Sequence, residues 1–185
     1  MSALARSERP LPVPNVEITR MRRRHLRKIL SIEGSVYPRP WSAGLFLSEM
    51  AQRTTRSYIV ARLAGEVVGY AGMMFLPLEA HVTNIAVDPD LQSQKIGSRL
   101  LLTIINQAVE RGSDVISLEV RVSNVAAQAM YAKFGFSIAG VRKGYYIETR
   151  EDAYVMEADG ALSDDYRRRL QAISLELEEY EGGGT

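Results

Sequence analysis

Residues 81–122 constrain the fold more than any other stretch, because they predict a strand, a long helix and a second strand in succession. His81 to Asp88 has the composition of a strand. Gly97 to Arg111 carries apolar residues at helical spacing along one face, and Gly112 is suited to end that helix. Val115 to Val122 alternates apolar and polar residues with the period of a strand. A helix with one apolar face between two strands predicts a sheet covered by helices.

The surrounding sequence continues this alternation. We expect further helices at Arg24–Ser35, Ser42–Arg53 and Asn124–Phe134, and further strands at Ser57–Leu63, Glu66–Phe75, Ser137–Tyr146 and Asp152–Ala158. Ala64 and Gly65 predict a tight turn that joins the first two of these strands in a hairpin. Because no linker or repeat interrupts the pattern, we expect one α/β or α+β domain over residues 16–160.

Both ends of the chain differ from this domain. Residues 1–15 contain three prolines and predict an extended, disordered leader. In residues 161–185, Ser163 is suited to cap an amphipathic helix, and the last residues predict a flexible tail. The helix is shorter than the three to four heptads that would indicate a coiled coil. A helix that folds back on the domain is therefore favoured over one that binds a partner.

The composition excludes several classes of protein. The 185 residues include no cysteine, which excludes disulfides, zinc–thiolate sites and a cysteine nucleophile, and is typical of a cytoplasmic protein. Lys plus Arg number 23 and Asp plus Glu 22, so the net charge of +1 excludes a protein that coats nucleic acid through its overall field. Two histidines make a multi-histidine metal centre unexpected, and no apolar run is long enough to span a membrane.

One local concentration of positive charge surrounds His25. It consists of Arg20, Arg22, Arg23, Arg24, Arg27 and Lys28. Such a cluster is compatible with a nucleic-acid patch, but it lacks interleaved aromatic residues. We favour a solvated helix face and expect no stable binding of nucleic acid.

The segment from Asn84 to Leu101 is the most informative about chemistry. A strand ends at Asp88, a polar loop follows, and the helix begins near Gly97. Free backbone N–H groups and the positive end of a helix dipole together suit a pyrophosphate group. Lys95 and Arg99 add positive charge. The alternative is an ordinary connection between a strand and a helix.

This segment resembles the signature of the GCN5-related N-acetyltransferase (GNAT) superfamily, Gln/Arg-x-x-Gly-x-Gly/Ala, which matches here as Gln92-x-x-Lys95-x-Gly97. Further likenesses lie at Leu118–Asn124, at Tyr145-Tyr146 and in the Tyr37–Ser42 loop. Together they cover about residues 16–158 and are similar to the ribosomal-protein alanine N-acetyltransferase (RimI) branch. Lys95 departs from the signature, because glycine there tolerates positive φ at no cost. We expect acetyl-CoA binding to survive, since Gly97 and the helix start remain.

The resemblance implies a mixed, mostly antiparallel sheet that splays at an acetyl-CoA site, with the helix after residue 160 as an addition. The implied cofactor-binding residues are Ile85, Ala86, Val87, Gln92, Ser93, Gln94, Lys95, Ile96, Gly97, Ser98 and Asn124. The backbone of Ile85 to Val87 would hold the pantetheine arm as an added strand would, with the Val87 N–H aimed at the oxyanion. No metal is implied.

The resemblance also assigns the acid–base groups. Glu119 falls where this branch has its proton acceptor, and Tyr131 falls where it has its general acid. From the residues alone, a salt bridge with a neighbouring arginine is the favoured explanation of Glu119, and core packing explains Tyr131 without a function. A phenol has the chemistry to protonate a departing thiolate. His81 is chemically suitable as a base, but a histidine near a strand end is more often structural. We therefore do not select it as a catalytic residue.

The expected acceptor is the α-amine of a ribosomal protein, held by Tyr37, Trp41, Tyr145 and Tyr146. A small-molecule amine or a protein lysine is the alternative, because aromatic side chains cradle small amines as well. A second alternative is an inactive module that binds CoA or a partner. The oligomeric state does not follow from the sequence.

Overall fold

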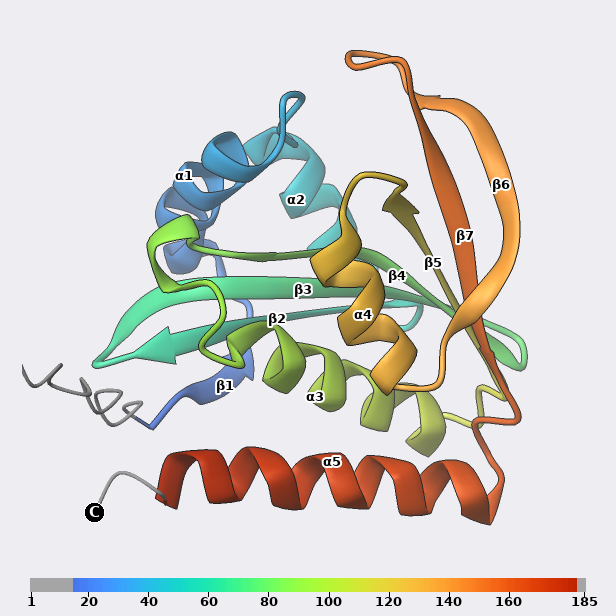
Figure 1. Cartoon of the computed structure of the whole chain (residues 1–185). Coiled ribbons are helices and arrows are strands. Elements are labelled where there is room, and N and C mark those ends of the chain that lie inside the picture. The colour runs from blue at the N-terminus through green and yellow to red at the C-terminus, as the bar shows by residue number, and fades with distance from the viewer. Residues whose placement is uncertain (1–14, 183–185) are drawn as a thin grey trace, which may run out of the picture.

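A computed structural model describes residues 15–182 and contains one seven-stranded sheet with helices on both faces (Figure 1). The strands are β1 (Glu17–Arg20), β2 (Arg56–Leu63), β3 (Glu66–Leu76), β4 (Glu79–Val87), β5 (Val115–Arg121), β6 (Ser137–Tyr146) and β7 (Glu151–Asp159). The helices are α1 (Leu26–Val36), α2 (Ala43–Ala51), α3 (Ile96–Glu110), α4 (Val125–Lys133) and α5 (Asp164–Gly182), with 3₁₀ turns η1 (Arg23–His25) and η2 (Pro89–Leu91).

The strands lie in the order β1-β2-β3-β4-β5-β7-β6. Every neighbouring pair is antiparallel except β4 and β5, which are parallel and joined by α3. A parallel pair requires a crossover connection, and the strongly amphipathic α3 is that connection. The expected mixed, mostly antiparallel sheet is confirmed.

The two faces of the sheet carry separate cores. On one face, α1 and α2 cover the sheet, and Phe46 and Tyr70 lie at the centre of the packing with their rings edge to face. On the other face, α3 packs through Leu100, Leu101 and Ile104, each fully buried. These cores fix the position of the last residues of β4 and the first turn of α3, which border the site described below.

Helix α5 extends along α3 on the side away from the sheet (Figure 1). Its apolar residues Tyr166, Leu170, Ile173 and Leu177 are buried in the same core as α3. Ser163 accepts a hydrogen bond from the Tyr166 N–H, as a capping residue does. This helix therefore folds back on the sheet domain.

Most elements agree with the sequence analysis to within two residues. Strand β1 was not predicted, because four residues at a sheet edge are too few to show a pattern. The Ala64-Gly65 hairpin is confirmed, since both residues have positive φ. The leader and tail expectations lie outside the described residues, apart from Asn15 and Gly182. No helix within residues 15–182 is long and apolar enough to cross a membrane.

The packing of α5 predicts a contrast between two leucines of one helix. Leu170 is 5% exposed, and its replacement by alanine should lower the free energy of unfolding by about 2–4 kcal/mol, since it empties a packed site. Leu175 is 54% exposed, so Leu175→Ala should change it by less than about 0.5 kcal/mol. Urea denaturation measures both, and equal effects would contradict the packing described here.

Candidate active site

The site lies where β4 and β5 separate. Their parallel pairing runs from Glu79 opposite Val115 to His81 opposite Ser117 and then ends. Strand β4 continues to Val87 and β5 to Arg121, so each strand has an unpaired edge facing the gap. Two cavities, of about 640 and 370 Å³, lie at this gap. The expected splay in the sheet is therefore present.

The larger cavity is bounded by the end of β4, the start of α3 and one side of α4. Ten of the eleven residues predicted to bind the cofactor line it, namely Ile85, Ala86, Val87, Gln92, Ser93, Lys95, Ile96, Gly97, Ser98 and Asn124. Gln94 is the one predicted residue that does not line it. Lys133 of α4 also lines the cavity, and the sequence analysis missed it.

The β4 backbone presents hydrogen-bonding groups to this gap. The Asp88 N–H donates to the Val68 oxygen at 2.8 Å, which makes those two residues a hydrogen-bonded pair of the β3–β4 ladder. Such pairs alternate along antiparallel strands, so the N–H and C=O groups of Val87 and Ile85 face away from β3. The Ile85 oxygen accepts a hydrogen bond from the Tyr37 hydroxyl at 2.8 Å, as this orientation requires.

Arg99 does not supply positive charge to this cavity, contrary to the sequence expectation. Its guanidinium donates to the Leu177 oxygen and forms an ion pair with Glu181 at 3.1 Å, both on α5. The first turn of α3 has Arg99 on the face that packs against α5, which the sequence pattern alone did not reveal. Lys95 and Lys133 are the two lysines in the cavity wall, and both form ion pairs with Glu176 of α5. Arg121 also lines the cavity and pairs with Glu151 of β7.

Glu119 lies in a wall common to both cavities. The side chain is only 10% exposed, and each carboxylate oxygen has a cationic or N–H partner: His81 Nε2 at 2.9 Å from Oε2 and Arg142 Nη2 at 3.2 Å from Oε1. The hydrogen bond from His81 is the main cause that lowers the Glu119 pKa below its usual range. Glu119 is therefore a carboxylate throughout the neutral pH range.

His81, which the sequence analysis did not select, contacts Glu119 in this site. Its Nδ1 lies 2.9 Å from the Ser117 hydroxyl, and its Nε2 contacts Glu119. If Nε2–H donates to the carboxylate, the neutral ring has Nδ1 free to accept from Ser117, so the two partners select one tautomer. The parallel register of β4 and β5 places His81 beside Ser117 and Glu119. This register is a property of the folded sheet and is not visible in the sequence.

Tyr131 also lies in the wall shared by the two cavities. It projects from α4, which Asn124 caps by accepting a hydrogen bond from the Ala127 N–H at 3.1 Å. Burial raises the pKa of the Tyr131 phenol well above its usual value, because the phenolate would be desolvated. The side chain therefore keeps its proton at neutral pH and can donate it.

The smaller cavity is walled by aromatic residues. All four side chains predicted to bind the acceptor line it, namely Tyr37, Trp41, Tyr145 and Tyr146. Glu33 of α1 lines it too, although the sequence gave no reason to select it. Its Oε1 accepts from the Trp41 N–H at 2.9 Å, while Oε2 is buried without a hydrogen-bond partner among residues 15–182. Burial raises the Glu33 pKa above its usual range.

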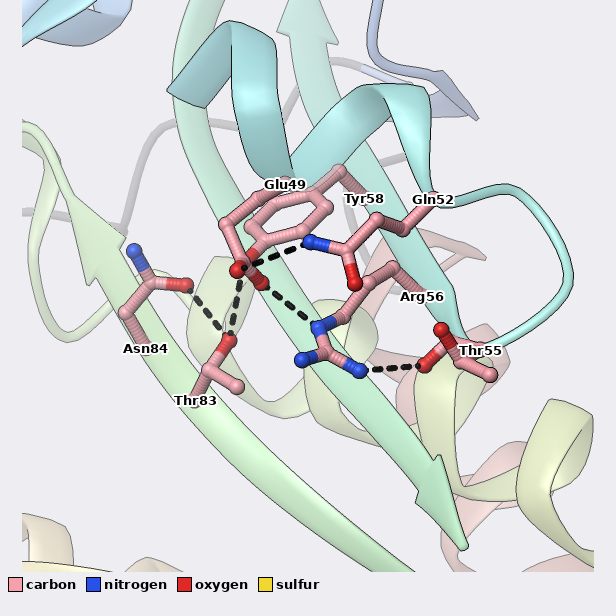
Figure 2. Close-up of polar contacts among 7 residues, drawn as sticks. All are labelled: Glu49, Gln52, Thr55, Arg56, Tyr58, Thr83 and Asn84. Atoms are coloured by element: carbon pink, nitrogen blue, oxygen red, sulfur yellow. Dashed lines mark hydrogen bonds and ion pairs between the residues drawn. The ribbon is translucent and has the colours of Figure 1, made fainter. Parts of the chain in front are cut away.

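Figure 2 shows polar contacts that connect two β4 residues of this cavity, Thr83 and Asn84, to Tyr58 and Glu49. Thr83 and Asn84 of β4 line the cavity, and the Thr83 hydroxyl donates to Asn84 Oδ1 at 3.1 Å. The Tyr58 hydroxyl lies 3.2 Å from Thr83 and donates to Glu49 of α2. A Cβ on Gly72 would come within 3.0 Å of Tyr58, Thr83 and Asn84, so only glycine fits beneath this network.

Comparison with known proteins agrees with this geometry. Residues 26–136 match the model of the Acetyltransferase (GNAT) family, more than half of the chain. This chain belongs to the GNAT family. It is therefore an acetyltransferase. Within residues 15–182, no group of three His, Asp or Glu side chains is placed to hold a metal ion.

Relatives within the GNAT family carry more specific names. The ribosomal protein bS18-alanine N-acetyltransferase of Escherichia coli (strain K12) is 39% identical over 127 residues, 68% of this chain and 84% of that protein. N-alpha-acetyltransferase RimI of Mycobacterium tuberculosis (strain ATCC 25618 / H37Rv) is 42% identical over 124 residues, 65% and 76% of the two chains. The crystal structure of the Escherichia coli ribosomal-protein-S18-alanine N-acetyltransferase superimposes with a TM-score of 0.73 at 33% identity, covering 80% of this chain and 96% of that one.

The departure from the GNAT signature has a structural cost. Lys95 is the residue before α3 and has φ 61°, the left-handed conformation that a side chain disfavours by about 1 kcal/mol or more. Its ammonium group lies 3.9 Å from Glu176, so the side chain extends toward α5. Lys95 therefore adopts the left-handed backbone conformation that the glycine of the signature tolerates without cost.

Two substitutions separate the strain from the charge. Lys95→Gly should raise the free energy of unfolding by about 1 kcal/mol relative to Lys95→Ala, because both lose the ammonium group but only glycine relaxes at positive φ. Chemical denaturation of the two variants measures the difference. A Lys95→Gly variant no more stable than Lys95→Ala would show that the backbone here carries no strain.

Proposed function

We propose that this acetyltransferase transfers the acetyl group of acetyl-CoA directly to the α-amine of a protein N-terminus, and that the natural acceptor is a ribosomal protein beginning with alanine. The observation that carries the proposal is the meeting of two cavities at Glu119 and Tyr131. One cavity has the backbone edge and helix start that suit a phosphorylated thioester, and the other has aromatic walls. The names of the relatives support the choice of acceptor.

The residues of the larger cavity fit acetyl-CoA. A Cβ on Gly97 would lie 3.4 Å from Met130 and 3.8 Å from Val87, in the space between two residues that line the cavity. The N–H groups of Ile85 and Val87 face the gap and suit an extended amide-bearing arm. The start of α3, with Lys95 and Lys133 beside it, suits phosphate groups. When bound, acetyl-CoA supplies an activated thioester.

The acceptor amine reaches the site largely as an ammonium ion and must lose a proton before it can attack. Glu119 takes this proton, directly or through one water molecule. His81 holds the carboxylate in place through Oε2, and Arg142 is 58% exposed, so the Oε1 side can open to the acceptor.

Tyr131 supplies a proton to the departing thiolate. Its phenol is buried where the two cavities meet, and the raised pKa keeps it protonated. The N–H of Val87 stabilises the negative charge that develops on the thioester oxygen. The sequence contains no cysteine to carry the acetyl group, so transfer is direct.

A panel of acceptors tests the proposed function. We expect the highest kcat/KM with peptides whose first residue is alanine, lower values when another residue replaces it, and very low values with spermidine or with an N-terminally blocked peptide containing lysine. Activity on spermidine or the lysine side chain alone would establish the alternative acceptor. Acetyl-CoA binding without any transfer would establish an inactive module instead.

Replacement of Glu119 should be most damaging at low pH. Because the Glu119 pKa is lowered, the carboxylate remains ionised in the neutral range, whereas the amine is mostly protonated below pH 7. Glu119→Gln should therefore lower kcat/KM by about 10²-fold or more at pH 6.5. At pH 9 the amine is already deprotonated, and the loss should be much smaller.

Glu148→Gln is the matched control for this measurement. Glu148 lines the acceptor cavity and pairs with exposed Arg39 at 3.7 Å, but it does not line the cofactor cavity. This variant should change kcat/KM by a similar small factor at both pH values. If Glu119→Gln behaves in the same way, Glu119 is not the proton acceptor.

Tyr131→Phe should reduce kcat about 10²-fold while leaving the Kd for acetyl-CoA nearly unchanged, because it removes only the proton donor. Steady-state kinetics and calorimetric titration measure the two quantities. An unchanged kcat would remove the proposed role. A weakened Kd with unchanged kcat would assign Tyr131 to binding.

A further inference from the structure

A third cavity, of about 950 Å³, is separate from both cavities of the active site. It lies at the sheet edge where β1 ends at Arg20, while Arg56 and Ser57 of β2 continue beyond the β1–β2 pairing. The end of α2 borders it on one face of the sheet, and the second half of α3 borders it on the other. It shares no lining residue with the active-site cavities.

Six arginines line this space, which we call the arginine cavity. They are Arg20, Arg22, Arg23, Arg53, Arg56 and Arg111. They come from the β1–η1 segment, the loop after α2, β2 and the end of α3. Among the described residues that line the cavity there is no aspartate or glutamate. The chain as a whole has a net charge of only +1, so the positive charge is concentrated here by the fold.

Two of the six arginines are fixed by the protein. Figure 2 shows the Arg56 guanidinium held by Glu49, with Nε 2.7 Å from Oε2, and by the Thr55 carbonyl. Arg111 stacks over the Phe75 ring at 4.0 Å and donates to the Thr54 carbonyl. Of these six arginines, only Arg56 has a carboxylate partner within residues 15–182. The other five guanidinium groups have no ion-pair partner among these residues.

This arrangement is unfavourable for the protein alone and favourable for an anion. Like charges that line one concave surface repel each other, and the repulsion is relieved when a multivalent anion enters. The cavity also contains buried Met21 and Ile59, which place a low-dielectric wall behind the charges and strengthen the local potential. Planar guanidinium groups bind phosphate oxygens with two parallel hydrogen bonds.

We infer that the arginine cavity binds a chain of phosphate groups, either an oligophosphate or the phosphodiester backbone of single-stranded RNA. Its volume is at the upper end of the range for ligand sites and far exceeds one phosphate. Its charges come from four segments and so suit several phosphates in succession. The inference is independent of the proposed acetyl transfer, because no residue of either active-site cavity takes part.

The sequence analysis expected the basic cluster around His25 to be a solvated face. The fold divides that cluster. Arg20, Arg22 and Arg23 enter the cavity wall, whereas Arg24, Arg27 and Lys28 do not, and Lys28 pairs with Asp88 at 3.0 Å. The partners that make a phosphate site from the first group are Arg53, Arg56 and Arg111, which lie 30 to 91 residues further along the chain.

Binding is tested on the full chain with two probes, inorganic tripolyphosphate and a ten-nucleotide uridine RNA. Coenzyme A is kept saturating, so that neither probe is measured in the cofactor cavity. Fluorescence anisotropy reports the RNA, and calorimetry reports tripolyphosphate. Binding of RNA alone would identify a phosphodiester chain, and binding of tripolyphosphate alone would identify an oligophosphate. Failure of both probes at low salt would overturn the inference.

The triple variant Arg20→Gln, Arg23→Gln, Arg53→Gln removes three exposed guanidinium groups from the cavity. We expect it to weaken the Kd for the bound probe by about tenfold or more, and to reduce the slope of log Kd against log salt for RNA by about 2. Its melting temperature without ligand should not fall, since repulsion is relieved. Its kcat with a short peptide should equal that of the parent protein.

The matched control is Arg27→Gln, Arg167→Gln, Arg168→Gln, which removes the same charge from exposed positions that do not line the cavity. It should retain probe affinity within about twofold. Equal losses in the two triple variants would show that the probes respond to overall charge, and the inference would then be wrong.

Discussion

The early end of the β4–β5 pairing is the constraint on which the rest of the site depends. The two strands are parallel for three residue pairs and then diverge, which leaves backbone groups of Ile85 and Val87 without strand partners. Buried backbone groups without partners are costly, so such an edge is maintained only where the surrounding packing enforces it. Here the α3 core on one face and the α1–α2 core on the other hold the strands apart.

The last paired residues also set the chemistry. His81 and Ser117 lie opposite each other where the pairing ends, and Glu119 is the next residue of β5 on the same face. The geometry therefore builds a hydrogen-bonded series from Ser117 through His81 to Glu119 at the floor of the gap. A carboxylate held in this way keeps its position and charge, which an acid–base group needs. The neighbouring aromatic wall determines what can approach it.

Helix α5 lies outside the residues that match the GNAT family model, yet it contacts the cofactor side of the domain. Glu176 pairs with Lys95 and Lys133, and Glu181 pairs with Arg99 on the side of α3 that faces α5. The addition thus redistributes the cations around the start of α3. The strained Lys95 is held within this set of contacts, which are the local compensation for a residue that is unfavourable in its backbone conformation.

The sequence by itself determined the elements with strong periodicity and the family, and it selected Glu119 and Tyr131 as candidate acid–base residues, because amphipathic patterns and short motifs are local in the chain. It also indicated the strain at Lys95, since positive φ follows from the signature. It did not reveal His81 beside Glu119, the buried Glu33 or the turn of Arg99 toward α5. Nor did it show that arginines from four segments line one cavity. Each of these depends on which strands are neighbours and in which register, and only the tertiary structure decides that, because contacts between distant residues are fixed by packing rather than by local pattern.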